Sequence, residues 1–231
     1  MFCHTVSEFH EVTSLCSKVT MSQNSAKPKH KYRHIFLDAE GTLYVPKHGR
    51  SRWVFWENPS AEAAVDFFEL DKGVRQALEQ LRGEVDTVCL VSRNSELILN
   101  ALLDKFGIRD YFDEIMVNGH KGKKILEYLQ KNGFRRDESI MIGDMPSLDI
   151  IPVRDCGIEA ILVDRPYNRS VVSERITGVR DLPAWLRLAD IADRPARPRL
   201  ATLDEFFGAV AQFAHDAENG TTKSLIAVAR T

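Results

Sequence analysis

Short apolar segments alternate with amphipathic helical segments between residues 34 and 164, and this alternation constrains the fold more than any other feature. Apolar runs bounded by turn residues predict buried strands, and a 3.6-residue periodicity predicts helices. The predicted strands span residues 34–38, 86–92, 112–119, 139–144 and 159–164, and the predicted helices span residues 73–82, 95–107, 123–133 and 147–157. Strand–helix alternation with short connections produces right-handed crossovers and a parallel sheet covered on both faces. The sequence therefore predicts an α/β fold with a central parallel sheet between two layers of helices.

The segments on either side of this alternation predict one folded domain with appendages. Residues 1–32 are polar and poorly periodic, so we expect a disordered or poorly structured extension before a domain at residues 33–188. Met21 offers a second candidate start of the chain. Residues 189–231 are predicted to form a linker, an amphipathic helix and a tail. This helix is expected either to dock on the core or to join a second copy of the chain, giving a homo-oligomer.

Composition and charge argue against several classes of function. The formal net charge of −2 gives no general attraction to nucleic acid or anionic membrane, and the basic run at residues 27–33 is interpreted as a solvated lead-in. No run of 18 apolar residues is present, so no membrane span is expected. The four cysteines lack metal-ligand spacing, and the first 20 residues lack the features of a secretory signal. These observations favour a cytoplasmic location.

Polar side chains gather where the predicted strands end. In parallel sheets, ligands bind beyond the carboxyl ends of the strands, so these side chains are expected to share one pocket. They are Asp38 and Glu40 after the first strand, Ser92, Arg93 and Asn94 at the second, Lys121, Lys123 and Lys124 after the third, and Asp144 and Asp149 after the fourth. The pocket would hold several carboxylates, a hydroxyl and an ammonium group.

This set of groups is suited to phosphoryl transfer. Carboxylates packed together repel one another unless a hard cation neutralises them, and oxygen ligands of this kind suit Mg²⁺. The cation also neutralises a substrate phosphate, which allows one carboxylate to attack phosphorus as a nucleophile. A second acid, related to the first as Glu40 is to Asp38, can protonate the leaving oxygen and then activate water.

Four short motifs, in order along the chain, carry a family resemblance. They are FLDAEGTL, LVSRN, HKGKK and MIGDMPSLD. Together they resemble the four motifs of the haloacid dehalogenase-like (HAD) hydrolase superfamily over residues 33–188. Each motif alone is unspecific, but each follows a predicted strand. The resemblance implies a Rossmann-like three-layer core and a Mg²⁺-dependent phosphatase acting on a phosphorylated substrate whose class stays open.

The resemblance also implies a role for each matching residue. Asp38 matches the nucleophile, which is also a metal ligand. Glu40 occupies the general acid/base position, and its backbone carbonyl is expected to face the metal. Asp144 matches the acid that binds metal after the fourth strand, and Asp149 the second acid, binding directly or through water. The remaining matches are phosphate-binding candidates, namely Ser92, Asn94 as a weaker candidate, and Lys121 with Lys123 as its alternative.

Glu40 is a departure, because phosphatases of the superfamily usually carry aspartate there. Glutamate keeps the carboxyl group but moves it outward by about one bond, ~1.5 Å. Enolase-phosphatase-like members are similar at this position, with Asp-Ile-Glu-Gly-Thr, so the change is compatible with turnover. Two alternatives stay open. One is a catalytically weak member that binds a phosphorylated ligand or partner; the other, disfavoured by Glu40, Asp144 and Asp149, is a haloacid dehalogenase-type hydrolase.

Residues 44–70 stand where superfamily members insert a cap over the substrate, and here the insertion is short. It carries basic residues, among them Arg50 and Arg52, beside Trp53, Phe55 and Trp56. These side chains form either a lip that holds a phosphorylated or aromatic group, or a solvated loop followed by aromatics packed on the core.

Overall fold

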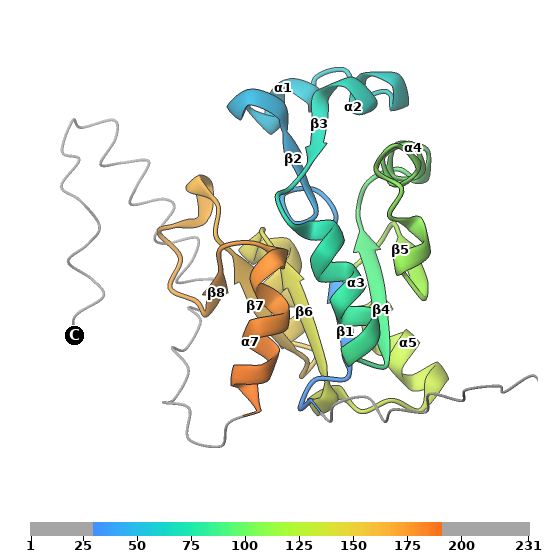
Figure 1. Ribbon diagram of the computed structural model, residues 1–231, viewed down its shortest axis with the longest axis vertical. Helices are drawn as coiled ribbons and strands as arrows, with labels where there is room; N and C mark the ends of the chain where they lie inside the picture. Colours follow the sequence, from blue (N-terminus) through green and yellow to red (C-terminus); the bar gives the residue numbers. More distant parts are fainter. Residues whose placement is uncertain (1–29, 191–231) are drawn as a thin grey trace, which may run out of the picture.

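The central sheet of the computed structural model has six parallel strands, in the order β5-β4-β1-β6-β7-β8 (Figure 1). The structure describes residues 30–190. The strands are β1 (His34–Leu37), β4 (Thr87–Ser92), β5 (Glu114–Val117), β6 (Ser139–Gly143), β7 (Glu159–Val163) and β8 (Arg175–Ile176). In β1, Phe36 lies opposite Cys89 on one side and Met141 on the other. The predicted α/β fold with a central parallel sheet is confirmed.

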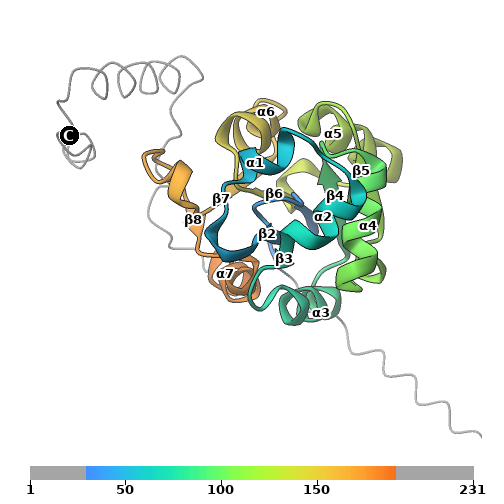
Figure 2. The same ribbon diagram turned by 90° about the horizontal axis from the view of Figure 1, so that it is seen from above.

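Helices cover both faces of the sheet, and each face has its own hydrophobic core (Figure 2). One face is covered by α3 (Val74–Glu84), α4 (Glu96–Phe106) and α7 (Leu182–Ala189), the other by α5 (Lys121–Asn132) and α6 (Ile151–Arg154). Alternate side chains of a strand point to opposite faces. In β1, therefore, Ile35 and Leu37 join the first core and Phe36 joins the second.

Residues 44–70, which we call the cap hairpin, rise beyond the carboxyl ends of the strands (Figure 1). Strands β2 (Tyr44–Pro46) and β3 (Phe68–Leu70) pair antiparallel, and α1 (Arg52–Trp56) and α2 (Ala61–Phe67) connect them. The ring of Phe55 is buried, with centroid distances of 5.6 Å to Phe67 and 5.0 Å to Phe68. The short insertion is thus a small folded unit with its own aromatic contacts.

Several helix ends follow from the sequence. The hydroxyl of Ser95 accepts a hydrogen bond from the Ile98 amide and caps α4, whose other end is closed by Gly107 at φ 57°. Gly133 closes α5 in the same left-handed conformation, which glycine adopts without steric cost. Both terminal glycines agree with the helix ends predicted from the sequence.

Other boundaries differ from the sequence-based expectation. The helix α5 begins at Lys121, two residues before the predicted start, because the ring of His120 accepts a hydrogen bond from the Lys123 amide and caps it. The predicted helix at 147–157 is a π-helical turn, Pro146–Ile150, followed by α6. The strand β8 was not predicted.

The packed chain also begins before the predicted boundary at residue 33. His30 and Tyr32 are buried, and the Lys31 amide donates to Asp190 across the end of α7. The predicted extension up to residue 29, and the predicted linker, amphipathic helix and tail from residue 191, lie outside the described residues. Within residues 30–190, no helix has both the length and the apolar character needed to cross a membrane.

Candidate active site

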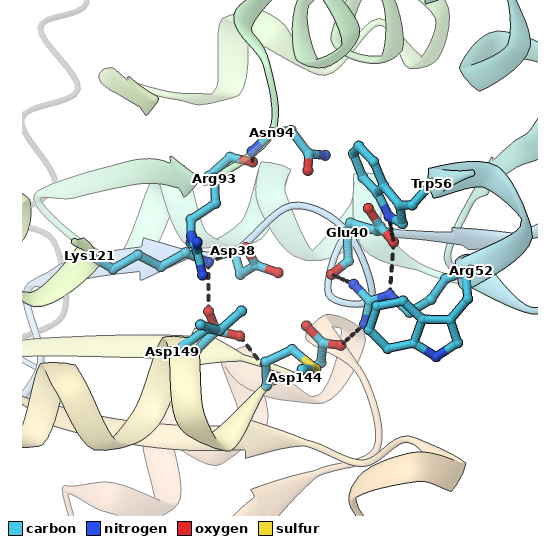
Figure 3. A pocket seen from close by; sticks show the side chains of 13 residues that line it. Asp38, Glu40, Arg52, Trp56, Arg93, Asn94, Lys121, Asp144 and Asp149 are labelled. Carbon is cyan, nitrogen blue, oxygen red and sulfur yellow. Dashed lines mark hydrogen bonds and ion pairs between the residues drawn. The ribbon is translucent and has the colours of Figure 1, made fainter. Parts of the chain in front are cut away.

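One pocket lies at the carboxyl ends of the strands, beneath the cap hairpin (Figure 3). Asp38 directly follows β1, Ser92 ends β4, and Asp144 directly follows β6. The pocket is lined by Asp38, Glu40, Arg52, Trp53, Trp56, Ser92, Arg93, Asn94, Lys121, Asp144, Met145, Leu148 and Asp149. Of the polar residues that the sequence placed at the strand ends, only Lys123 and Lys124 are not part of this lining.

Three aspartates form the centre of the pocket. Asp38, Asp144 and Asp149 are buried, and one carboxylate oxygen of each lies within 4.8 Å of the others. The Oδ2 atom of Asp149 accepts a hydrogen bond from the Met145 amide at 2.8 Å, which helps to fix the carboxylate's orientation. The Oδ1 atom of Asp144 is buried and has no hydrogen-bond partner among the described residues. A buried carboxylate oxygen without a donor is costly, so this oxygen-only set fits a divalent cation such as Mg²⁺.

Lys121 balances part of this negative charge. Its Nζ atom contacts a carboxylate oxygen of Asp38 and lies 2.6 Å from Oδ1 of Asp149. The side chain is buried and reaches the acids from the first turn of α5. Lys123, two residues further along the same helix, is exposed and does not line the pocket. Of the two candidate lysines, only Lys121 is in contact with the acids.

Burial and charge shift the pKa values of these groups in predictable directions. Desolvation raises the pKa of Asp38 and of Asp149, and the ammonium group of Lys121 partly opposes this increase. Desolvation raises the pKa of Asp144 as well, with a further increase from the charge of Asp149. Burial alone would lower the pKa of Lys121, but the two neighbouring carboxylates raise it above its ordinary value. Lys121 is therefore a stable cation in the site.

Glu40 is held from the cap hairpin. Its Oε1 atom accepts a hydrogen bond from Nε of Arg52 at 2.8 Å and another from Nε1 of Trp56 at 3.2 Å. Desolvation raises the pKa of this carboxyl group, and the charge of Arg52 opposes the increase. Figure 3 shows Arg52 and Trp56 on one side of the carboxylates and Lys121 on the opposite side.

Arg52 also reaches the predicted metal ligands. Its Nη1 atom donates to Oδ2 of Asp144 at 2.6 Å, and its Nη2 atom donates to the backbone carbonyl of Glu40 at 3.3 Å. The hydroxyl of Tyr167 donates to the same oxygen of Asp144 and accepts from Arg52 at 2.9 Å. The guanidinium group thus neutralises the edge of the acid cluster that Lys121 does not reach.

The residues at the end of β4 also line the pocket. The hydroxyl of Ser92 accepts a hydrogen bond from the Asn94 amide at 3.1 Å. The side-chain amide of Asn94 donates to the hydroxyl of Tyr44, at the start of the cap hairpin, at 2.8 Å. Arg93, which lies between Ser92 and Asn94 in the sequence, lines the pocket and is exposed. Ser92 and Asn94 therefore line the pocket at the end of β4, where the Asn94 side chain also contacts the cap hairpin.

A tight turn after β1 brings Glu40 and Asp144 together. Gly41 has a φ of +81°, and a Cβ atom at this position would collide with the carboxylate of Asp144 and lie 2.8 Å from the Tyr167 hydroxyl. The carbonyl of Gly41 accepts a hydrogen bond from Arg165 at 2.6 Å. Only glycine fits this turn without displacing the acid.

Arg52 and Trp56 are two residues whose roles the sequence left undecided. The sequence placed them on the insertion, as a lip or as part of a solvated loop, and the structure places both side chains against Glu40. The signal available was their spacing, since residues four apart share one face of a helix. This spacing could not be recognised as helical, because a five-residue helix is too short to show a repeated pattern.

Comparison with known proteins agrees with the geometry. The family model described as "Haloacid dehalogenase-like hydrolase" matches residues 15–163, more than half of the chain. The chain belongs to the haloacid dehalogenase-like hydrolase family. No curated protein sequence matches this family member significantly.

Solved structures share its fold, and two of the three described here are of HAD proteins. A hydrolase from Ehrlichia chaffeensis matches with a TM-score of 0.54 and 16% identity, over 70% of this chain and 98% of that one. A HAD phosphatase from Thermococcus onnurineus matches with a TM-score of 0.51 and 20% identity, over 69% and 100% of the two chains. An uncharacterized protein from Listeria monocytogenes serotype 4b matches with a TM-score of 0.51 and 22% identity, over 68% and 97%. At these identities the likeness establishes the HAD-like core and nothing finer.

Proposed function

We propose that this HAD-like hydrolase is a Mg²⁺-dependent phosphohydrolase that acts through a covalent aspartyl-phosphate on Asp38. The observation that carries the proposal is the cluster of Asp38, Asp144 and Asp149 with Lys121 bound to two of them. Such a cluster needs additional positive charge, and a bound cation together with Lys121 would attract a phosphate group. The relative from Thermococcus onnurineus is a HAD phosphatase, which supports the same reaction class.

The residues that would hold Mg²⁺ are Asp38, Asp144, the backbone carbonyl of Glu40 and, directly or through water, Asp149. Bound there, the ion would neutralise the phosphoryl oxygens and lower their repulsion of the nucleophile. Arg52 donates to two of these ligand groups, Asp144 and the Glu40 carbonyl. The guanidinium group thus supplies part of the positive charge that this edge of the cluster requires, and the ion would share these two groups with it.

The protein groups then have distinct tasks. The carboxylate of Asp38 forms a bond to phosphorus as the bond to the leaving oxygen breaks, and Glu40 gives that oxygen its proton. Lys121 and Ser92 bind phosphoryl oxygens, with Asn94 in support. In the second step water attacks phosphorus, its proton passes to Glu40, and the bond between Asp38 and phosphorus breaks. The products are an alcohol and inorganic phosphate, and both carboxyl groups return to their starting states.

The class of phosphorylated substrate stays open. A catalytically weak protein that binds a phosphorylated ligand or partner would use the same pocket, and turnover distinguishes the two.

The test is phosphate release from p-nitrophenyl phosphate with Mg²⁺ or with EDTA. We expect metal-dependent release by the wild type and none by Asp38→Asn, while Asp66→Asn, which changes an exposed acid of the cap hairpin, keeps the wild-type rate. A panel of other phosphate esters is assayed in the same way, because a selective enzyme would not hydrolyse p-nitrophenyl phosphate. Binding of phosphate without any turnover would favour the non-catalytic role, and release that persists in EDTA or in Asp38→Asn would refute the proposed chemistry.

A further inference from the structure

We infer that Arg52 and Trp56 of the cap hairpin are positioning residues that hold Glu40 in place for proton transfer. The inference rests on the proposed function and names the part of the chain that makes a glutamate workable as the acid/base. Arg52 and Trp56 would act through Glu40 and need not touch the substrate.

The pattern of hydrogen bonds is the first argument. Nε of Arg52 and Nε1 of Trp56 both donate a hydrogen bond to the same oxygen of Glu40, Oε1. No described residue donates a hydrogen bond to the other oxygen, Oε2, and Glu40 is one of the residues that line the pocket. Holding one oxygen with two donors fixes the plane of the carboxyl group. The second oxygen is then the one that can carry the proton to and from the reacting atoms.

The length of the side chain is the second argument. Glutamate has one more rotatable bond than the aspartate usual at this position, and an unrestrained side chain would spread over several rotamers. A misplacement of about 1 Å can reduce a rate on the order of 100-fold. Two fixed donors remove this freedom. The extra flexibility of the longer acid is therefore compensated by contacts that a shorter acid would not reach.

The rigidity of the donors is the third argument. The guanidinium group of Arg52 is fixed at its other end by Asp144, at 2.6 Å, and by Tyr167, at 2.9 Å. Its side chain is only 13% exposed. Arginine can bind two carboxylates at once through its planar fork, which lysine cannot reproduce. Arg52 therefore couples the position of Glu40 to that of Asp144.

The placement of α1 is the fourth argument. Arg52 and Trp56 lie four residues apart on this helix, and Phe55 between them is buried against Phe67 and Phe68. The aromatic contacts hold the helix in the hairpin, and the helix then presents both donors to Glu40. The cap hairpin is thus a structural part of the proton-transfer apparatus.

The first experiment compares esters that need a general acid with one that does not. Loss of the Glu40 proton donor slows breakage of a bond to a poor leaving group, such as the alkoxide of glycerol 2-phosphate, far more than a bond to p-nitrophenolate. We expect Arg52→Met and Trp56→Phe to lower kcat/KM for glycerol 2-phosphate on the order of 10- to 100-fold. For p-nitrophenyl phosphate, kcat/KM should change much less. Arg52→Lys should recover only part of the loss.

Arg50→Met is the matched control, because Arg50 lies on the same hairpin, is exposed and does not line the pocket. Arg50→Met should leave kcat/KM unchanged for both esters. An equal loss on both esters in Arg52→Met and Trp56→Phe would overturn the positioning role, since it would indicate general damage. If the wild type released no phosphate from any phosphate ester, the proposed function would be overturned, and the positioning role would fall with it.

A second readout needs neither turnover nor metal. The indole N–H resonance of Trp56 reports its hydrogen bond to Glu40 in an NMR spectrum of the labelled protein. We expect this resonance to move in Glu40→Gln and in Arg52→Met and to stay in place in Arg50→Met, with the Trp185 resonance as internal reference. An unchanged Trp56 resonance in Glu40→Gln would contradict the hydrogen bond between Trp56 and Glu40, and with it the positioning role.

Discussion

Lys121 shows at the scale of a single residue how the site is balanced. Its ammonium group is buried between two carboxylates that are themselves raised in pKa by burial. Removing one partner of a buried ion pair leaves an uncompensated charge, which is far more costly than losing a surface charge. The structural role of Lys121 is therefore separable from its proposed role in phosphate binding.

We expect Lys121→Met to destabilise the metal-free protein by about 3 kcal/mol, because Asp38 and Asp149 lose their cation. The measurement is urea unfolding in EDTA at pH 7. Lys123→Met is the control on the same helix, and because Lys123 is exposed its effect should stay within about 0.5 kcal/mol. Equal effects of the two substitutions would contradict the assignment of Lys121 as the buried partner.

His34 gives the clearest pH dependence away from the acid cluster. It is buried at the start of β1, where its ring stacks on Phe134 at 3.9 Å and its Nδ1 atom lies 3.0 Å from the Thr87 hydroxyl. Burial lowers its pKa below the ordinary value of 6.5, although Asp86 opposes the shift. Between the lowered pKa and 6.5 the unfolded chain binds more protons than the folded one, so stability falls as the pH falls through this range.

The test is the free energy of unfolding between pH 5 and 8 for the wild type and for His34→Phe, which keeps an aromatic ring against Phe134. The difference in unfolding free energy between the two proteins should be constant above about pH 7.5. As the pH is lowered below 6.5, the wild type should lose stability relative to His34→Phe. Parallel curves of unfolding free energy against pH over the whole range would show that His34 does not contribute to the pH dependence of stability.

At the scale of elements, α5 places Lys121 by close packing against α6. A Cβ atom on Gly122 would collide with the carbonyl of Pro152 and lie 2.9 Å from Sγ of Cys156. Glycine inside a helix costs about 0.5–1 kcal/mol relative to alanine, so its presence here reflects the close approach of the two helices.

Gly122→Ala should therefore destabilise the protein by about 1–3 kcal/mol and shift the first turn of α5. Gly83→Ala is the matched control, because Gly83 lies in α3 with no atom within 4 Å of its added Cβ, and it should stabilise the protein by roughly 0.5–1 kcal/mol. Thermal and urea unfolding measure both. A stabilising Gly122→Ala would show that the helices can separate at no cost.

The sequence predicted most elements because their patterns are local. The buried strands appear as continuous apolar runs that end in polar residues, and α4 ends at a glycine. The pattern failed where an element is short or depends on distant contacts. The strand β8 has two residues, and Gly122 hid the first two residues of α5, a helix that the ring of His120 caps.

At the scale of the whole molecule, the parallel sheet explains why the site could be anticipated. Strands of one direction bring their carboxyl ends to one edge, so Asp38, Ser92 and Asp144 had to meet once the strands were identified. Arg52 could not be placed in the same way. Its position depends on how the cap hairpin folds back, which the packing of Phe55 decides.

The proposed chemistry depends on covalent phosphorylation of Asp38 during turnover. The most direct measurement is to quench the reaction of the protein with Mg²⁺ and a phosphate ester with borohydride, which reduces an aspartyl-phosphate to homoserine, and to map the peptides by mass spectrometry. We expect homoserine at position 38 only when both Mg²⁺ and the ester are present, and never in Asp38→Asn. Phosphate release under the same conditions with Asp38 unmodified would contradict it.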